Sequence, residues 1–313
     1  YEFVYVSPKG PIKDVLKKKE ITYLPLENNS CTCLNLILKK WNPDIIHAHD
    51  FKASVKVAFS PYKCIKISHL HQNPMWIKSL NFRSLLYSVS CLRLHKILSV
   101  SSEILEEAIF SKIIQNKSFV LTNNVNTKFI LDAANEGCVN EKFDLAFVGR
   151  LTKSKNPLRF IKIVKELTKE KKEISAVMIG DGELRSECEG LIKNLQLSKN
   201  IKMMGFLSNP FPIMKNCKML IITSVWEGFG LVAVEAMVLG KPVFATNVGG
   251  LKTIVDKNCG GLYTIDEDCV KKVLHTLNVE NYYNFLSENS KKRAKKFGDI
   301  QEWVKKLKQI YYD

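Results

Sequence analysis

The stretch Met219–Asn247, with the sequence MLIITSVWEGFGLVAVEAMVLGKPVFATN, decides the fold predicted for this chain. It opens with an uncharged apolar run, residues 219–222, which is typical of a buried strand, and a glycine-containing loop follows. Apolar residues then recur at helical spacing over residues 231–238, before a Gly and a Pro lead into a second apolar run, residues 243–245. Strand, loop, helix and strand together form one βαβ unit.

The loop of this unit, residues 226–230, carries the features of a ligand site. Gly228 and Gly230 leave room for a ligand close to the backbone, and the free N–H groups at the start of a helix attract an anion. Glu227 and Glu235 lie on either side of the loop and its first helical turn, and carboxylates accept hydrogen bonds from hydroxyl groups. A site in which backbone amides bind an anion and carboxylates bind hydroxyl groups suits a nucleotide sugar as the ligand.

The residues Glu227 to Leu231, with Glu235 and Ala236, resemble the E-x7-E motif of retaining glycosyltransferases with the GT-B fold, glycosyltransferase family 4 (glycosyl transferases group 1) in particular. The resemblance implies an α/β fold in which two Rossmann-like βαβ domains face each other across a cleft. It also implies hexosyltransferase-type transfer from a nucleotide-sugar donor, with no metal ion and no other cofactor.

A second loop supports this resemblance. The apolar strand over residues 145–148 runs into Gly149 and Arg150, and Lys155 follows after a short turn. Two cations suit a diphosphate, and an Arg side chain can bind it through two parallel hydrogen bonds. The family has a V-G-R-L stretch followed by K-N, which implies that Arg150 and Lys155 neutralise the diphosphate of the donor. A basic loop without a ligand is the alternative interpretation.

The other donor-binding residues follow from the resemblance. The G-D-G stretch at Gly180 and the G-F stretch before Phe206 match parts of the family that line the pocket for the base, with Leu207 next to it. Glu227 is expected to bind hydroxyls of the donor sugar, and Glu235 the ribose. The predicted donor-binding residues are therefore Gly149, Arg150, Lys155, Gly180, Phe206, Leu207, Glu227, Gly228, Phe229, Gly230, Leu231 and Glu235, and the predicted catalytic residues are Glu227, His71, Arg150 and Lys155.

Four of the six histidines lie near predicted strand ends, as the pairs His47/His49 and His69/His71. Strands alternate with helices here, which favours a parallel sheet, and ligands bind such sheets outside the carboxyl ends of the strands. We expect one histidine of a pair to face the cleft while its partner packs below. A metal site is disfavoured because no Cys or further acid completes a recognised ligand spacing. Likeness to the family's cleft histidine indicates His71 near the reacting sugar, with His69 as the alternative.

The predicted domains are an acceptor-side domain over residues 1–130 and a nucleotide-sugar-binding domain over residues 143–290. Small and polar residues over 131–142 predict a linker between them. Residues 291–313 are expected to form a C-terminal helix that, as in other GT-B proteins, crosses back to the first domain. The first strand, residues 2–7, resembles the second strand of the family, which implies that the chain lacks the family's first βα unit.

The composition limits the partners. The 313 residues carry a formal net charge of +16, from 47 Lys and Arg against 31 Asp and Glu. Lysines spread along the chain suit an anionic membrane surface or a merely solvated surface, and no basic motif interleaved with aromatic residues indicates nucleic acid. The odd number of scattered cysteines, nine, favours a reduced protein in the cytoplasm. The expected partners are a UDP- or GDP-sugar and a glycan or lipid-linked acceptor, in polysaccharide biosynthesis at the inner face of the cytoplasmic membrane.

Three other functions compete with glycosyl transfer. A dinucleotide oxidoreductase would explain the match of residues 228–233 to G-x-G-x-x-A, but the next strand ends in Thr246-Asn247, without the acid that binds a ribose. A nucleotide-sugar epimerase on the same fold would need catalytic acids in the first half of the chain. A noncatalytic subunit of a glycosyltransferase complex would keep the fold and the donor site without turnover.

Overall fold

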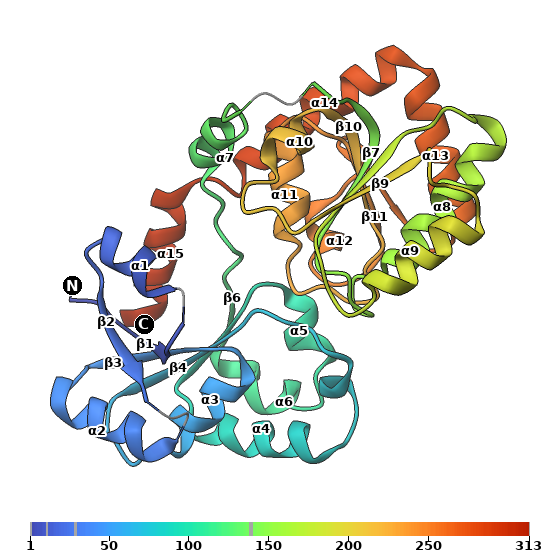
Figure 1. Ribbon diagram of the computed structural model, residues 1–313. Coiled ribbons are helices and arrows are strands. Elements are labelled where there is room, and N and C mark those ends of the chain that lie inside the picture. Colours follow the sequence, from blue (N-terminus) through green and yellow to red (C-terminus); the bar gives the residue numbers. More distant parts are fainter. Residues whose placement is uncertain (1, 11, 28–29, 138–139, 313) are drawn as a thin grey trace. The chain divides into compact units, whose positions relative to one another are not determined.

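The computed structural model describes every residue except 1, 11, 28–29, 138–139 and 313, and the chain divides into two compact units (Figure 1). Unit 1 comprises Tyr1–Leu70, Trp76–Leu98 and Ala108–Phe119. Unit 2 comprises Val120–Asp313 together with two short segments, His71–Met75 and Ser99–Glu107. Parallel strands alternate with helices in both units.

Unit 1 contains a two-stranded parallel sheet, β1-β2, and strands of a four-stranded sheet in the order β3-β4-β5-β6. The strands are β1 Val4–Pro8, β2 Thr22–Leu26, β3 Ile45–His49, β4 Ile65–Leu70, β5 Lys96–Ser99 and β6 Ser118–Val120. The helices are α1 Ile12–Lys18, α2 Cys31–Trp41, α3 Asp50–Phe59, α4 Phe82–Arg93 and α6 Ser111–Ile114, with 3-10 turns at Met75–Lys78 and Gln115–Lys117.

Local sequence explains the helices of unit 1. Ser30 caps α2, since its hydroxyl accepts a hydrogen bond of 3.2 Å from the N–H of Cys33, and Asn42 ends the helix in the left-handed conformation. Asn81 opens α4 with a capping box that it shares with Ser84. These caps satisfy backbone groups that a helix end leaves without partners.

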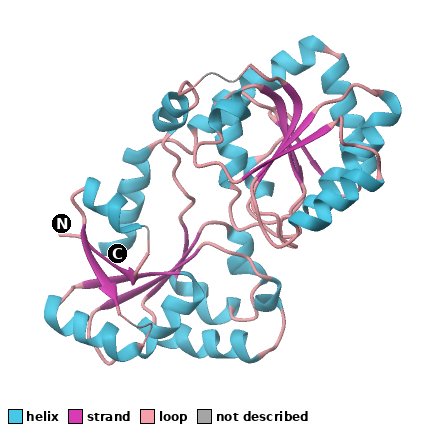
Figure 2. Ribbon diagram, in the orientation of Figure 1, coloured by secondary structure: helices cyan, strands magenta, loops and turns pink. Residues whose placement is uncertain are grey.

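Unit 2 is built on a six-stranded parallel sheet in the order β12-β11-β10-β7-β8-β9. Its strands are β7 Phe143–Val148, β8 Ala176–Ile179, β9 Ile201–Gly205, β10 Cys217–Ile222, β11 Val243–Thr246 and β12 Gly260–Tyr263. Figure 2 shows helices on both sides of this sheet. Unit 2 contains the helices α5 Ser102–Glu107, α7 Thr127–Ala133, α8 Pro157–Glu170, α9 Arg185–Asn194, α10 Phe211–Lys215, α11 Leu231–Val238, α12 Leu251–Ile254, α13 Asp266–Asn278, α14 Glu280–Lys295 and α15 Ile300–Tyr312.

The direction of strand addition reverses between β7 and β10. From β7 the sheet grows through β8 to β9 on one side, and from β10 through β11 to β12 on the other. Loops that leave the carboxyl ends of two such neighbouring strands diverge and leave a crevice, which is where open parallel sheets bind ligands. The loops after β7 and β10, residues 149–156 and 223–230, therefore lie at the position expected for a site.

The βαβ unit predicted over residues 219–247 is present as β10, α11 and β11. Its strands are buried because helices cover a parallel sheet on both faces; Met219, Ile221 and Phe244, each at most 1% exposed, join one core with residues of β7 and α8. In unit 1, α4 ends at Arg93, and β5 begins at Lys96.

Helices lie at the start of the expected linker and in the C-terminal segment of the chain. Helix α7 covers Thr127–Ala133 and so occupies the start of the segment 131–142, while residues 138–139 lie outside the described residues. The indole N–H of Trp303 in α15 donates a hydrogen bond of 2.6 Å to the carbonyl of Thr122, and both residues belong to unit 2. That α15 crosses back to the first domain stays a prediction.

None of the described helices has both the length and the hydrophobicity that a membrane-spanning helix requires.

Candidate functional site

The loops after β7 and β10 are fixed to each other by hydrogen bonds. The N–H of Val225 donates to the carbonyl of Ser154 at 2.8 Å. The hydroxyl of Thr223, which is fully buried, lies 2.9 Å from the carbonyl oxygens of both Lys155 and Asn156. Because these contacts hold the main chain on both sides, the side chains of one loop meet those of the other at a defined place.

Lys155 and Glu227 form an ion pair between these two loops, from Lys155 Nζ to Glu227 Oε2. The hydroxyl of Ser224 lies 3.2 Å from the same carboxylate oxygen. The two side chains are 24% and 13% exposed, so the pair is shielded from solvent on most sides. An ammonium and a carboxylate, 72 residues apart in sequence, therefore stand together at the carboxyl edge of the sheet.

Two glycines allow the backbone beside Glu227 to pack closely. A Cβ at Gly228 would lie 1.9 Å from the carbonyl oxygen of His71, which belongs to the same unit. Gly249 has a φ of +54°, and a Cβ there would lie 1.7 Å from the carbonyl oxygen of Glu227. Real side chains cannot approach so closely, and the positive φ favours glycine as well. The main chain of His71 is thereby placed directly against the loop that carries Glu227.

Arg150 follows Gly149 at the same strand end and points its charge at solvent. Its side chain is exposed, and it forms no ion pair with any residue that the structure describes. Lys155 packs over Gly149, since a Cβ built at Gly149 would lie 3.8 Å from Lys155 Cγ. One loop thus carries two cations, of which one is held by Glu227 and one remains available to an anion.

Glu235 lies in the second turn of α11 and is partly buried. Burial raises the pKa of its carboxyl group above the ordinary 4.5. Within the described parts of the chain, no hydrogen bond or ion pair compensates this carboxylate. A ligand that donates hydroxyl hydrogen bonds would supply the missing partners.

The residues predicted to surround the base are connected through the main chain. The N–H of Gly149 donates to the carbonyl of Ile179 at 2.9 Å, and the N–H of Gly180 donates to the carbonyl of Gly205 at 2.8 Å. The loops after β7, β8 and β9 therefore form one continuous edge. At its end Phe206 is 77% exposed and Leu207 is partly exposed, so both side chains remain open to a ligand.

Phe229 differs from the other residues of its loop. Its side chain is only 2% exposed and meets the ring of Phe297 edge-on, at a centroid distance of 5.7 Å and an angle of 76°. The buried ring anchors the loop in the core. The next position outward, Leu231, is 43% exposed.

Two residues of the site are absent from the sequence predictions. Thr223 fixes the main chain of Lys155, and Ser224 contacts the carboxylate of Glu227. Their signal is two hydroxyl residues directly between an apolar run and the glycine loop. Ser and Thr are common at strand ends, so this signal alone does not separate a site residue from an ordinary turn.

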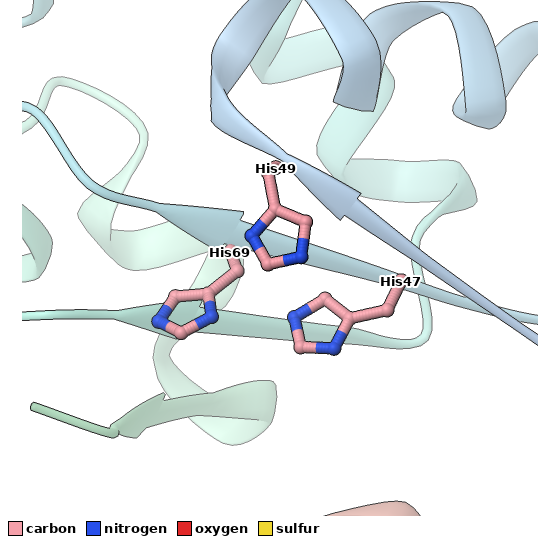
Figure 3. Close-up of side chains that lie close together, drawn as sticks. All are labelled: His47, His49 and His69. Carbon is pink, nitrogen blue, oxygen red and sulfur yellow. The ribbon is translucent and has the colours of Figure 1, made fainter. Parts of the chain in front are cut away.

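The histidines are arranged differently from the expectation. His47, His49 and His69 stand together at the ends of β3 and β4 (Figure 3), whereas His71 follows β4 and belongs to unit 2. The prediction that one member of each pair packs below the other is wrong for His47 and His49. The strand stays extended through His49, and residues two apart on a strand share a face.

Comparison with known proteins identifies the family of this chain. The family model described as glycosyl transferases group 1 matches residues 131–293, just over half of the chain. The chain belongs to this family. The match covers most of unit 2, including both loops that carry Lys155 and Glu227.

Individual curated proteins are also similar to the chain. An uncharacterised glycosyltransferase of Methanocaldococcus jannaschii is 34% identical over 203 residues, which is 63% of this chain and 54% of the relative. A UDP-Gal:α-D-GlcNAc-diphosphoundecaprenol α-1,3-galactosyltransferase of Escherichia coli is 27% identical over 210 residues, covering 63% of this chain and 54% of the relative. The chain thus spans about half the length of these curated relatives.

Among solved structures, the chain resembles HepE of Anabaena in complex with UDP. The TM-score is 0.85 at 19% identity, with 98% of this chain and 90% of HepE covered. At this identity the likeness concerns the fold, and it confirms the predicted α/β architecture of the GT-B glycosyltransferases.

Proposed function

We propose that this member of the family is a retaining glycosyltransferase that moves a sugar from a UDP- or GDP-sugar to a glycan or lipid-linked acceptor. The observation that carries the proposal is the Lys155–Glu227 pair, which two interlocked loops hold at the switch point of the sheet. Names of similar proteins support the donor class: HepE binds UDP, and the relative from E. coli transfers galactose from a UDP-sugar.

In the proposed reaction a hydroxyl oxygen of the acceptor forms a bond to the anomeric carbon as the bond between that carbon and the diphosphate breaks. The electron pair of the broken bond leaves with the diphosphate, which takes up the proton of the acceptor hydroxyl. Arg150, Lys155 and the backbone N–H groups from Gly228 to Leu231 then stabilise the negative charge of the leaving group. These groups supply the charge for which other enzymes use a metal ion. They need little reorganisation during the reaction because the two loops are already hydrogen-bonded to each other.

The acids and the histidine bind the other parts of the donor. We assign hydroxyls of the donor sugar to Glu227 and the ribose to Glu235, whose partly buried carboxylate suits such hydroxyl groups. His71 is assigned to the reacting sugar, since its main chain packs against Gly228. The likeness of Glu227 and Glu235 to the E-x7-E motif supports retention of configuration, and Phe206 with Leu207 is assigned to the base.

Nucleotide binding tests the cationic half of the site. Titration of the chain with UDP, GDP and ADP, followed by calorimetry, should identify a preferred nucleoside diphosphate. Lys155→Ala should weaken its binding by roughly ten-fold or more, since an ion pair to phosphate within a partly shielded site contributes about 1.5–3 kcal/mol. Lys153→Ala is the matched control, because Lys153 is exposed in the same loop. An unchanged affinity in Lys155→Ala would remove this residue from the site.

Turnover tests the reaction itself. Incubation with a panel of nucleotide sugars should release the nucleoside diphosphate, and Glu227→Ala should abolish release while the protein still folds. Glu166→Ala, on the exposed face of α8, serves as the control. Donor binding without turnover in the unmodified chain would instead support a noncatalytic subunit, an epimerised sugar nucleotide would indicate an epimerase, and NAD binding would overturn the assignment.

The acceptor proposal rests on α4. This helix buries Ser84, Tyr87, Ser90 and Cys91, whereas large apolar side chains lie on its exposed face. The exposed side chains are Phe82 at 79%, Leu85 at 47%, Val89 at 50% and Leu92 at 69% exposure. They recur three or four residues apart and so form one stripe along the helix. A surface helix of a globular protein normally has its apolar side chains on the buried face and its polar side chains on the exposed face.

We propose that this stripe docks the protein on the anionic inner face of the cytoplasmic membrane, where a lipid-linked acceptor is found. Arg83 and Arg93 are exposed on the same helix, and the whole chain has a net charge of +16. Apolar side chains beside cations are typical of helices that lie in the headgroup region of a bilayer. The relative from E. coli, named for a diphosphoundecaprenol-linked substrate, is consistent with such an acceptor.

Vesicle sedimentation separates this surface from other exposed apolar residues. The chain should sediment with vesicles that contain phosphatidylglycerol and less with neutral vesicles, and Leu92→Glu should reduce the bound fraction several-fold. Leu36→Glu is the matched control, since Leu36 of α2 is 63% exposed against 69% for Leu92. Equal losses in the two variants would contradict a docking role for α4.

A further inference from the structure

Three histidines of unit 1 form a cluster that the proposed transfer reaction does not use. His49 of β3 is the direct register partner of His69 in β4, and His47 precedes His49 by two residues on the same face. Figure 3 shows the three rings gathered over the strand ends. Ring centroids lie 4.6 Å apart for His47 and His49, 5.2 Å for His47 and His69, and 5.7 Å for His49 and His69.

The nitrogen atoms of these rings are close enough to hold one metal ion. One ring nitrogen from each histidine can be chosen so that all three lie within 4.8 Å of one another. Ligands about 2.0–2.1 Å from a tetrahedral ion are roughly 3.3 Å apart, so binding requires the nitrogens to close in by about 1.5 Å or less. Rotation of the side chains about χ1 and χ2 covers such a distance without a change in the backbone.

The environment of the cluster favours an ion that enters from one side. His69 is buried, at 3% exposure, His47 is partly buried and His49 is exposed. The backbone at His69 is firmly placed, because the neighbouring Ser68 is fully buried and shares hydrogen bonds of 2.7 and 2.8 Å with Ser54 and Tyr87. A buried ligand at the base and an exposed one at the surface suit a site that fills from solvent.

We propose that His47, His49 and His69 bind one divalent transition-metal ion of the zinc class, with a fourth position open to water or a further ligand. Three imidazoles suit Zn²⁺, Co²⁺, Ni²⁺ or Cu²⁺, whereas Mg²⁺ and Ca²⁺ prefer oxygen ligands. The ion would tie the carboxyl ends of β3 and β4 together and stabilise unit 1 by mass action. The residues assigned to the donor, all in unit 2, take no part in it.

Metal titration of the untagged, EDTA-treated chain tests the site. We expect one Zn²⁺ per chain by plasma mass spectrometry after equilibrium dialysis, a higher melting temperature with Zn²⁺, and the strong visible absorption of tetrahedral Co²⁺. His49→Ala should weaken Zn²⁺ binding by more than roughly 100-fold, since loss of a residue that merely supports a metal ligand already costs about 10–100-fold. His49 is exposed, so the metal-free variant should melt at the temperature of the parent.

Two controls separate this site from other binding. His275→Ala, in α13, removes a histidine outside the cluster and should leave Zn²⁺ binding unchanged. Cys31→Ser with Cys33→Ser removes a closely spaced thiol pair, which would reveal itself by sulfur-to-cobalt absorption. Retained binding in His49→Ala, or lost binding in the cysteine variant, would overturn the proposal. UDP affinity should be the same in His49→Ala and the parent, so failure of the metal site and failure of the proposed transferase are distinguishable.

Discussion

The candidate site of unit 2 is shaped by its main chain, and the histidine cluster of unit 1 by its side chains. In unit 2, Gly228 and Gly249 let backbone segments touch, and main-chain hydrogen bonds connect the loops after β7, β8 and β9. In unit 1, a buried side-chain network beneath the cluster places β4. A site shaped by close backbone contacts is easier to predict from sequence, because only glycine tolerates such contacts. A cluster of side chains gives a weaker sequence signal.

The largest effect is expected where the backbone approach is closest. Gly249→Ala would place a Cβ 1.7 Å from the carbonyl oxygen of Glu227 at a φ of +54°. We expect the free energy of unfolding to fall by roughly 2–4 kcal/mol, from overpacking and an unfavourable φ, and nucleoside diphosphate binding to be lost. Urea denaturation and calorimetry with UDP measure the two effects.

A second glycine provides the matched control for this variant. Gly190, in α9, has no atom within 4 Å of an added Cβ. Gly190→Ala should therefore raise the free energy of unfolding by roughly 0.5–1 kcal/mol and leave UDP binding unchanged. If Gly249→Ala behaved like Gly190→Ala, close contact between backbone segments would not be what shapes the site of unit 2.

An intermediate effect on stability is expected in unit 1, where hydrogen bonds between buried side chains place β4. Tyr87→Phe removes a fully buried hydroxyl that lies 2.8 Å from Ser68 Oγ, and so leaves a buried polar atom with one partner fewer. The free energy of unfolding should fall by roughly 1–2 kcal/mol. UDP affinity should stay constant, because the donor site belongs to unit 2. Tyr5→Phe, at a ring 41% exposed, should change stability by less than about 0.5 kcal/mol. A loss of UDP binding in Tyr87→Phe would show that the two sites are coupled.

The smallest effect on stability concerns Glu235 and depends on pH. Burial raises the pKa of this carboxyl group above 4.5, so the folded protein binds a proton more readily than the unfolded chain. The parent therefore loses stability as pH rises from 4.5 through the raised pKa, and Glu235→Gln does not. The variant should be the more stable of the two at neutral pH, and the difference should vanish below pH 4.5.

The same variant separates stability from binding. Glu235→Gln should weaken binding of the nucleoside diphosphate by roughly ten-fold, because an uncharged amide replaces the carboxylate assigned to the ribose. Thermal melts across pH 4–8, with and without UDP, record both quantities. A stability difference that grows on acidification, or an undiminished affinity for UDP, would argue against the environment and the role assigned to Glu235.

Local pattern explains why so much of unit 2 is predictable. The apolar run, the glycine loop and the helical spacing of residues 219–247 each lie within one element or one turn, and the structure contains them as β10, α11 and β11. The same holds for Gly149, Arg150 and Lys155, which follow β7. The pattern does not show which side chains of a motif are buried. Phe229 belongs to a site motif, and yet its ring lies in the core.

The histidines of unit 1 show the limit of such patterns. Two histidines that are two residues apart share a face only if the strand continues through both of them. Periodicity does not locate the last residue of a strand, so the sequence does not show whether each pair stays together. In the structure β3 continues through His49 but β4 ends at Leu70, so three histidines meet and His71 departs.

By itself the sequence determined the α/β class, the βαβ unit around Glu227 and the two loops that resemble those of glycosyl transferases group 1. These features depend on periodicity and on glycines, which act over a few residues. Only the tertiary structure decided that Lys155 pairs with Glu227, that the carbonyl of His71 rests on Gly228, and that three histidines share one place. Those contacts arise from strand order and register, which are set by packing among residues far apart in the chain.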